Sequence, residues 1–434
     1  MPIDPASLLS SQKHRLIKLS VQTGSDHALL LDSFSGNEAI SQPFSFDLAL
    51  LSRDPLIELK TVLGQPTLLE IELANGAHRC IHGHITAFNH LNNDGGLSYY
   101  SATLSPWFWY LSQRVDSRIF QECTVVDVLH TVFAHYGALA KFRFDLAQGA
   151  PLRTHSCITQ FNETDEHFAR RLLEQEGLLF YFEHAAHNHT LVVRNDSDRL
   201  SPLEHQPVIQ YHQPSIPTNA DSISEWAAQR QQQSDALSVP SFDYKQAEPW
   251  EHVDTGLQDA ASDSAQLERY EFLGQHNPGS RADATNRVGW RRDALHALSK
   301  TFRGASNCRA MVPGYTFTLT QHPRHDPAWT PGRNDPSAPG ATIDEFLLLN
   351  VQHQGHNNYL TEAEADYSNT FTSIRRHILY RPQCLTPCPV VAGPLTAIVV
   401  GDSALGEVHT DEWARVKVRF HWQRQQADQR NGAR

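Results

Sequence analysis

Hydrophobic and polar residues alternate along the first hundred positions in short runs that turn residues separate. Residues 68–73 (LLEIEL) and 81–88 (IHGHITAF) show a period of two, which is typical of strands with one buried face. Between them, Asn75 and Gly76 form a dipeptide that strongly favours a hairpin turn. Several such runs at near-regular spacing predict a small antiparallel barrel or sandwich.

Two helices are predicted after this region by an apolar period of about 3.6 residues. The first begins after Thr124, which can cap it with Asp127 three residues on, and ends at Gly137. The second carries Phe168 on its apolar face and ends at Gly177. The acidic residues near its first turn are interpreted as charges that favour a helix N-terminus: Glu163, Asp165 and Glu166.

Strand and loop patterns return in the rest of the chain. A third helix is predicted from about Arg281 to about Ser299, and strands resume after it. Residues 324–344 are rich in proline and glycine and predict an exposed loop, whereas residues 381–394 predict a linker. Strands, helices and strands again indicate two β units with an α-containing insert, and a new domain is expected to start at about residue 390.

The last hydrophobic alternation lies close to the end of the chain. Val416, Val418, Phe420 and Trp422 alternate with polar residues and predict a half-buried strand. Together with residues 395–400 this strand is expected to form one hairpin. The residues after Trp422 are predicted to be disordered.

Composition and charge narrow the class of protein. At about 150 residues per domain, 434 residues favour roughly three domains. Hydrophobic residues make up 40% of the chain, which permits packed cores, and the net charge of −12 argues against general binding to nucleic acid or anionic membranes. No apolar run reaches the ~18 residues that span a bilayer, and the N-terminus shows no secretory signal, so the chain is expected to begin in the cytoplasm.

Cysteine and histidine are the candidate metal ligands. The six cysteines are too sparse for a disulfide framework, and Cys384 and Cys388 have no matching second pair, which disfavours a zinc site. His82 lies two residues from His84, as His187 does from His189, so each pair is expected on one strand face, as a surface pair rather than a metal site. Protonation of all 25 histidines would move the formal charge from −12 to +13, so charge-dependent association should change between about pH 7 and pH 5.

The search for catalytic motifs predicts no enzyme in this chain, and no catalytic, cofactor-binding or metal-binding residue is assigned. The nucleophile elbow, the phosphate loop, the dinucleotide fingerprint and the zinc-protease motif are all missing from the sequence. Residues 107–110 (WFWY) form an aromatic run, of which at least half should belong to the core, and a sugar-binding platform is the less favoured reading. The basic residues after Trp413 are interpreted as the outward face of a strand rather than a nucleic-acid site.

Several stretches, taken in order, resemble the VgrG family, the spike proteins of the bacterial type VI secretion system. The resemblance covers roughly residues 14–422. The stretches that carry it include EAISQPFSFDLALLS (38–52), GAHRCIHGHITAF (76–88), LSPWFWYLSQRVDSRIFQECTVVDVL (104–129), NETDEHFARRLLEQEGLLFYFEH (162–184), AGPLTAIVVG (392–401) and TDEWARVKVRFHW (410–422). The family-motif positions are Pro106, Trp107, Arg118, Ile119, Phe120, Gln121, Phe168, Gly177, Gly393, Pro394, Thr396, Arg415, Val416, Val418, Phe420 and Trp422.

The resemblance implies a mainly β fold with α inserts (α+β). Two related barrels like those of the phage baseplate hub, with helical insertions, would be followed by the beginning of an oligonucleotide/oligosaccharide-binding (OB) type barrel. The implied segments are a first barrel (14–120), an α/β insert (121–200), a second barrel with a helix and long loops (201–380), a proline-rich linker (381–389) and the start of the OB-type barrel (390–434).

The resemblance also implies a structural role without a cofactor. A homotrimer would cap the hexameric inner tube (the haemolysin-coregulated protein), bear a piercing needle, contact baseplate proteins, and deliver effectors with their adaptor chaperones. It would assemble in the cytoplasm and leave without a signal peptide, and nucleic acid is not an expected partner. The alternatives are a carbohydrate-binding module and an effector-bearing member whose catalytic domain lies outside this chain.

The sequence departs from the family pattern at its C-terminal end. Leu395 stands where the family usually has Gln, and Trp413-Ala414 stands where Tyr-Gly is common. The needle of the family is not present before Arg434, so the final strand is expected to begin a barrel whose other strands are missing. An engineered fragment and a natural truncation both explain this length, and the fragment is favoured.

Overall fold

The computed structural model describes most of the chain. No helix among the described residues is long and apolar enough to cross a membrane. The described residues are 12, 15–22, 29–94, 96–147, 152–212, 220–234, 236–243, 248–254, 267–272, 280–322, 345–359, 364–400 and 410–423. Residues 424–434, predicted to be disordered, lie outside them.

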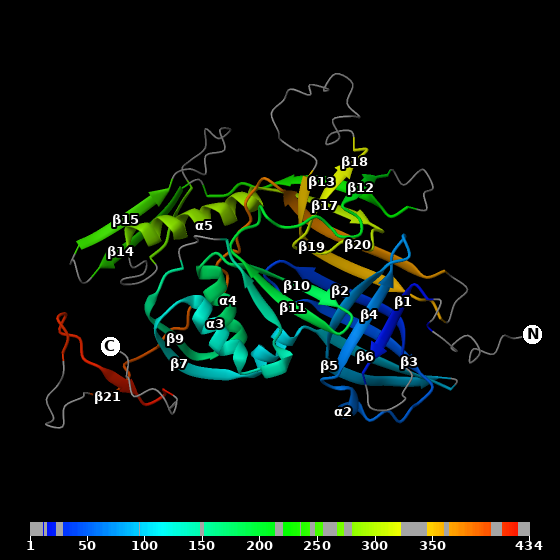
Figure 1. The fold of residues 1–434 in the computed structure, drawn as a ribbon, viewed down its shortest axis with the longest axis horizontal. Helices are drawn as coiled ribbons and strands as arrows, with labels where there is room; N and C mark the ends of the chain where they lie inside the picture. The colour runs from blue at the N-terminus through cyan, green and yellow to red at the C-terminus, as the bar shows by residue number, and fades with distance from the viewer. Residues whose placement is uncertain are drawn as a thin grey trace, which may run out of the picture.

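Six antiparallel strands from the N-terminal hundred residues form the first part of a twelve-stranded sheet (Figure 1). Their order in space is β1-β4-β5-β6-β3-β2, and the short helix α2 joins β3 to β4. The predicted turn at Asn75 and Gly76 is confirmed, because it connects β4 to β5 with Gly76 at a φ of +79°. The bounds are β1 Ile17–Val21, β2 Leu30–Ala39, β3 Ser45–Ser52, α2 Leu59–Val62, β4 Pro66–Glu72, β5 His78–Asp94 and β6 Leu97–Ser105.

The second part of the same sheet is a closed ring of six strands. Their order is β19-β18-β12-β13-β17-β20, and β20 pairs again with β19. The pairings of β12 with β13 and β18 are parallel, and the others in the ring are antiparallel. The bounds are β12 Val208–Tyr211, β13 Ser222–Arg230, β17 Lys300–Ser306, β18 Thr316–Thr320, β19 Glu345–His356 and β20 Asp366–Arg375.

The long strand β19 belongs to both parts of the sheet. Its residues from Asn350 to His356 pair with β2 on one side and with β20 on the other. A strand hydrogen-bonded on both edges leaves no open edge there, so the two strand groups form one continuous body. We call them the first ring (β1–β6) and the second ring (β12, β13 and β17–β20).

One side chain bridges the remaining gap in the first ring, between β1 and β2. Asn357, fully buried just after β19, donates from Nδ2 to the carbonyl oxygens of Ile17 and Leu31, at 2.8 Å each. Its Oδ1 accepts from the backbone N–H of Ile17 at 3.3 Å, and its own N–H donates to the carbonyl of Asp32. The asparagine therefore takes the place of a peptide partner for buried strand groups, which would otherwise cost free energy.

A mixed α/β insert follows the first ring and lies between it and the C-terminal hairpin in Figure 1. Its strands form two small sheets, β7-β9 and β10-β11-β8. The predicted cap of the first helix is confirmed, because Thr124 and Asp127 form a reciprocal capping box at α3. The bounds are η1 Trp107–Gln113, β7 Val115–Cys123, α3 Val125–Ala134, η2 Gly137–Leu139, β8 Phe142–Asp145, β9 His155–Thr164, α4 Asp165–Gln175, β10 Leu179–Ala185 and β11 Asn188–Arg194.

The other described elements lie outside the rings and the insert. The third predicted helix is confirmed as α5 (Arg281–Ser299), which packs near the small sheet of β14 (Ala236–Asp243), β15 (Glu248–Asp254) and β16 (Glu268–Tyr270). The C-terminal hairpin pairs β21 (Ala397–Val399) with β22 (Val418–Phe420). The final strand is therefore shorter than the strand predicted from Val416 to Trp422. Only three of its residues pair with β21, and Val416 forms an isolated bridge with Thr410.

The largest hydrophobic core joins the first ring to the insert. Phe46 and Leu104 of the ring belong to the same buried cluster as Trp107 and Phe133 of the insert. The second ring has its own core, which contains Phe346. Burial of apolar surface is the main favourable contribution to folding, so this shared core holds the insert against the first ring.

We predict that Asn357→Ala destabilises the first ring. The variant leaves three buried backbone groups of β1 and β2 without their partner, and each such loss costs about 1–3 kcal/mol. We therefore expect the free energy of unfolding to fall by about 3 kcal/mol or more, measured by chemical denaturation, with faster amide exchange in β1. Asn89→Ala makes the same chemical change at an exposed position and should change the free energy by about 0.5 kcal/mol or less.

Candidate functional site

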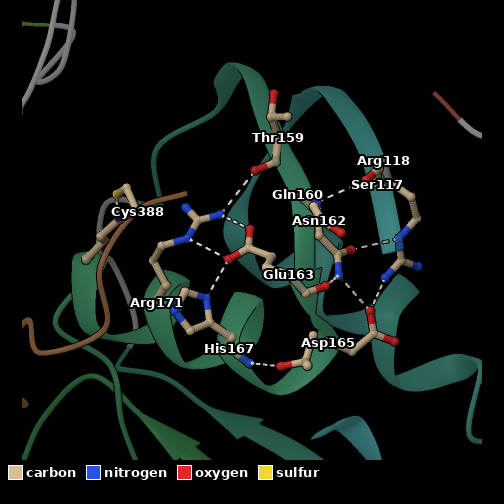
Figure 2. Close-up of polar contacts among 12 residues, drawn as sticks. Ser117, Arg118, Thr159, Gln160, Asn162, Glu163, Asp165, His167, Arg171 and Cys388 are labelled. Carbon is tan, nitrogen blue, oxygen red and sulfur yellow. Dashed lines mark hydrogen bonds and ion pairs between the residues drawn. The ribbon is translucent and has the colours of Figure 1, made fainter. Parts of the chain in front are cut away.

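The insert contains a buried network of ion pairs at the junction of β7, β9 and α4 (Figure 2). Thr164 caps α4 by accepting a hydrogen bond from the backbone N–H of His167, which places Asp165 at the first position of the helix. The Asp165 carboxylate is fully buried. It accepts from Arg118 Nη2 at 2.5 Å, from Gln160 Nε2 at 2.9 Å and from the Tyr136 hydroxyl at 2.8 Å.

A second carboxylate, that of Glu163, fastens α4 to β9 from the other side (Figure 2). Arg171 reaches back along the helix and donates from Nη2 to Oε1 at 2.5 Å and from Nε to Oε2 at 3.3 Å. His167 Nδ1 lies 2.6 Å from Oε2, and Arg171 also donates to the carbonyl of Thr159. The two-pronged guanidinium contact fixes the direction of the helix as well as its position.

Burial dominates the electrostatics of the first pair. Desolvation lowers the pKa of Arg118, whereas the carboxylates of Asp165 and Asp116 oppose that change. Burial and the hydrogen bond to Asp165 raise the pKa of the Tyr136 hydroxyl, which therefore stays protonated and donates. With its oxygens engaged by three donors, Asp165 is not free to act as a general base, so the geometry supports a positioning role.

Sequence reasoning assigned the acidic residues near α4 only to the charge of a helix N-terminus. The structure corrects this for Glu163 and Asp165, whose carboxylates are buried and paired with arginines. The arginine partner of Asp165 is Arg118, which lies 47 residues earlier in the chain. A local pattern cannot identify a partner at that separation, whereas Arg118 itself was singled out through the family motif.

We predict that Asp165→Ala strongly destabilises the insert. The buried guanidinium of Arg118 would lose its main counter-charge, and removal of one partner of a buried pair costs about 3–5 kcal/mol. Chemical denaturation should show a loss of this size. Glu166→Ala, one position along the same helix, removes a half-buried carboxylate 3.7 Å from Arg170 and should cost about 1 kcal/mol or less. Equal losses in the two variants would contradict the assigned role of Asp165.

The aromatic run after Pro106 is mainly core, as predicted. Trp107 and Phe108 are fully buried, and Trp107 donates from Nε1 to the carbonyl of Lys141 at 3.1 Å. Trp109 and Tyr110 are half-buried, and their rings meet edge to face at 78°. Two perpendicular rings do not form the flat surface that stacks on a sugar, which disfavours the carbohydrate-binding alternative.

The histidine pairs are not surface pairs. His82 and His84 are buried, because the hairpin β10–β11 of the insert covers β5 at this point. The second pair does not share a face, since His187 is exposed in the turn before β11 whereas His189 is buried. Among the described residues, no group of three or more histidine, cysteine or acidic side chains is arranged to hold a metal ion. Burial also raises the pKa of Cys384, which disfavours the thiolate that zinc requires.

The linker after the second ring is bound to the insert by Glu174, at the C-terminal end of α4. The Glu174 carboxylate accepts from the backbone N–H groups of Leu385 and Thr386 and from the Thr386 hydroxyl, at 2.8 Å each. Arg381 donates to the carbonyl of Gly177 at 2.9 Å. We call the contacts of Glu174 with Leu385 and Thr386 the linker anchor.

Gly177 is required by the local backbone and by packing. Its φ of +62° lies in the left-handed region, which confirms the predicted end of the helix. A Cβ atom at this position would lie 2.9 Å from Cγ of Trp290 on α5. Any larger residue would therefore push α5 away from the segment that receives the linker.

The remaining motif residues fall into two groups. Near the network of ion pairs, Ile119 is buried, the Phe120 ring stacks on Phe168 at 5.9 Å, and Gln121 pairs with Cys157 across β7 and β9. The C-terminal group lies apart from these: Gly393, Pro394 and Thr396 are exposed, Arg415 pairs with Asp411 at 2.6 Å, and Val416, Val418 and Phe420 belong to the hairpin region.

Trp422 connects the C-terminal hairpin to the insert. Its ring stacks on Phe420 at 5.0 Å and meets the ring of Phe161, on β9, at 5.1 Å. The linker anchor and this aromatic contact therefore join the C-terminal segment to the insert at two places. Neither Glu174 nor Phe161 was singled out from the sequence, because each acquires its role from a partner more than 200 positions away.

We predict that Glu174→Ala releases the linker. Hydrogen bonds to a charged group contribute about 1.5–3 kcal/mol, and about 1.4 kcal/mol corresponds to a tenfold change. The amides of Leu385 and Thr386 should therefore exchange with solvent about tenfold faster or more, as measured by hydrogen exchange. The Glu166→Ala variant serves as the control on the same helix. Unchanged exchange at both amides would show that the linker is held by other contacts.

The fold and its docked insert belong to a known class of structural protein. A family model described as the phage tail baseplate hub (GPD) matches residues 37–359, which is more than half of the chain, and the protein therefore belongs to the phage tail baseplate hub family. The description of this family is that of a structural part of the phage tail.

Within that class, the chain is similar to type VI secretion system spike proteins of Pseudomonas aeruginosa. It is 29% identical to VgrG1b over 429 residues, which cover 98% of this chain and 55% of VgrG1b. It is also 29% identical to VgrG1a over 425 residues, which cover 97% of this chain and 63% of that protein. The resemblance drawn from the sequence motifs is confirmed, and the chain spans little more than half the length of these relatives.

Solved structures confirm the predicted fold class of mainly β structure with helical inserts. An E. coli component of the type VI secretion system, described as structurally similar to the bacteriophage T4 tail proteins gp27 and gp5, has a TM-score of 0.66 at 20% identity. That match covers 93% of this chain and 88% of the other. The Francisella PdpA–VgrG complex matches with a TM-score of 0.51 at 9% identity over 91% of this chain and 57% of that one. At these identities the likeness shows the fold alone.

Proposed function

We propose that this chain forms the hub of a type VI secretion spike and acts through rigid geometry rather than chemistry. The single observation that carries the proposal is the agreement, over 97–98% of the chain, with spike proteins of that system. The continuous sheet supports it, because a strand shared by both rings resists relative movement of the two. A platform that transmits force needs such rigidity.

The assembly that we propose is a homotrimer placed on the hexameric tube protein. Two ring units per chain in three chains would present six similar units, which matches a six-fold ring. Exposed apolar side chains on the first ring and its connections, among them Leu56 between β3 and α2 at 85% exposure, would become buried at such contacts. Baseplate proteins, effectors and adaptor chaperones are the further proposed partners, and the proposed route is cytoplasmic assembly followed by export without a signal peptide.

The proposed domain division follows the segments implied by the family resemblance. Residues 14–120 and 201–380 would be the two hub barrels, residues 121–200 the insert, and residues 381–389 the linker. Residues 390–434 would begin an OB-type barrel, and the hairpin β21–β22 would be its first part. The linker anchor supports this division, because it holds residues 385–386, within the proposed linker, to the end of α4.

We predict concentration-dependent trimerisation and binding to the tube protein. Light scattering across a concentration series should show monomer changing to trimer, and the trimer should co-sediment with assembled tube hexamers. A chain that stays monomeric at every concentration and leaves the tube protein unbound would overturn the proposal.

A pair of matched variants tests the proposed contact surface. Leu56→Asp places a charge where burial is proposed and should weaken trimerisation or tube binding about tenfold or more. Lys60→Asp introduces the same side chain on α2, at a position that is 81% exposed, and serves as the control. Both variants should unfold at the wild-type temperature, because neither wild-type side chain is buried. If Leu56→Asp and Lys60→Asp changed association equally, Leu56 would not be assigned to the interface.

A further inference from the structure

Four histidine side chains gather where the first ring meets the insert. His82 and His84 come from β5, His184 from β10 and His189 from β11. The ring centre of His189 lies 5.2 Å from that of His82, 5.8 Å from that of His84 and 6.0 Å from that of His184. The rings of Phe44 and Phe182 pack against this histidine cluster and keep it apolar.

The hydrogen bonds of His189 and His82 require neutral imidazoles. The backbone N–H of Trp107 donates to Nε2 of His189 at 2.8 Å, so the proton of this ring lies on Nδ1. His189 Nδ1 lies 3.0 Å from Nδ1 of His82 and donates to it, which leaves the proton of His82 on Nε2. A second proton on His189 would lie on Nε2 and would face the backbone N–H of Trp107. A second proton on His82 would lie on Nδ1 and would face the Nδ1–H of His189.

Few neighbouring charges could compensate a protonated histidine. Among the described residues, the carboxylate recorded as an ion-pair partner of the cluster is that of Glu38 on β2, whose Oε1 lies 3.6 Å from Nε2 of His184. Glu38 already forms an ion pair with Arg79 of β5 and contacts His353 of β19 at 2.8 Å. Although burial opposes its ionisation, Arg79 and hydrogen bonds from His184 and His353 hold the pKa of Glu38 well below its usual range.

The other titratable groups that face the cluster are neutral or would add positive charge. They are Tyr110 of η1, whose ring meets that of His84 at 5.8 Å, Tyr367 of β20, whose hydroxyl contacts His353, and His187 in the turn before β11. Glu38 and Arg79 balance each other, so one imidazolium would leave a net positive charge in a buried site. Such a charge is expensive unless the structure opens to water.

The electrostatic shifts agree with this geometry. Burial, and then the neighbouring histidines, lower the pKa of His82 from 6.5 to about 4 and that of His189 to about 2. An opened state, in which water reaches these rings, would titrate near 6.5 and would bind more protons below that pH. The closed state therefore has its full stability above about pH 6.5 and loses stability as the pH falls toward 4.

We propose that the histidine cluster is an acid-sensitive contact that holds the hairpin β10–β11 against β5 only while its imidazoles are neutral. Acidification protonates the histidines and releases the hairpin from the first ring, while the rings keep their own strand pairing. Return to neutral pH restores the contact, since no covalent bond changes. This device is independent of the proposed role in secretion, because it acts within one chain.

Hydrogen exchange across pH tests the proposal. After correction for the intrinsic dependence of exchange on pH, the opening constant of residues 179–194 should rise between pH 6.5 and pH 4.5, by up to tenfold per pH unit for each proton bound. The amides of β19, which is paired on both edges, should stay protected over the same range. An opening constant that does not change between pH 7.5 and pH 4.5 would overturn the proposal.

A matched pair of variants separates this contact from general acid unfolding. In His189→Gln the amide oxygen can take the position of Nε2 and accept from Trp107, but it does not titrate, so the pH dependence should fall by about one proton. His90→Gln removes an exposed histidine of β5 that lies outside the cluster and should keep the wild-type dependence. Equal slopes for wild type and His189→Gln would overturn the proposal.

A spectroscopic measurement on the wild-type chain covers the case in which His189→Gln fails to fold. Nuclear magnetic resonance of labelled histidine side chains should show imidazoles in the closed state that remain neutral below pH 6, with the tautomers assigned above. Titration of His82 and His189 at an ordinary value near 6.5 without loss of the hairpin would contradict the proposal.

Discussion

The pairing of β19 with both β2 and β20 is the constraint on which the rest of the structure depends. β19 is a strand of the second ring and also pairs with β2 of the first, so without it the second ring could not close and the two rings would not be joined. Buried polar side chains mark this seam: Glu38 of β2 binds Arg79 of β5 and His353 of β19, and His353 contacts the hydroxyl of Tyr367 on β20 at 2.7 Å. Side chains alternate between faces along a strand, so a slip of one residue would turn Glu38 and His353 outward. We infer that this network selects one register, whereas its net contribution to stability is small.

The insert follows the same physical logic with a different geometry. Asp165 and Glu163 are buried carboxylates, each paired with an arginine, and they fix a helix rather than a strand. Because α4 carries Glu174 at its other end, the two ion pairs also determine where the linker is bound. Apolar packing around Phe168 would stabilise helix α4 in several similar positions. The directed ion pairs with Arg118 and Arg171 allow only one of these positions.

Local signals in the sequence predicted the local elements well. The capping box at Thr124, the left-handed stop at Gly177 and the turn at Asn75 and Gly76 all depend on residues within a few positions of one another. The closure of the first ring could not be predicted in this way, because Asn357 acts on Ile17, 340 positions earlier. The histidines of β5 were expected at the surface for the same reason: the hairpin that covers them begins about a hundred residues later. The family motifs pointed to Arg118 and Trp107, but they gave no partner for either residue.

The contacts described above form a series from the rings to the C-terminal hairpin. β19 joins the two rings, and the histidine cluster joins β5 of the first ring to β10 and β11 of the insert. Glu174, which forms the linker anchor, lies close to β10 along the chain. Only three residues separate it from Leu178, which directly precedes β10. Gly177 lies within this short connection and packs against Trp290, so the connection has little room to move independently. A displacement of β10 would therefore shift the end of α4 that holds residues 385 and 386. By this route, we expect protonation of the histidine cluster to change how firmly the C-terminal segment is held, because the connection between the two sites is only a few residues long.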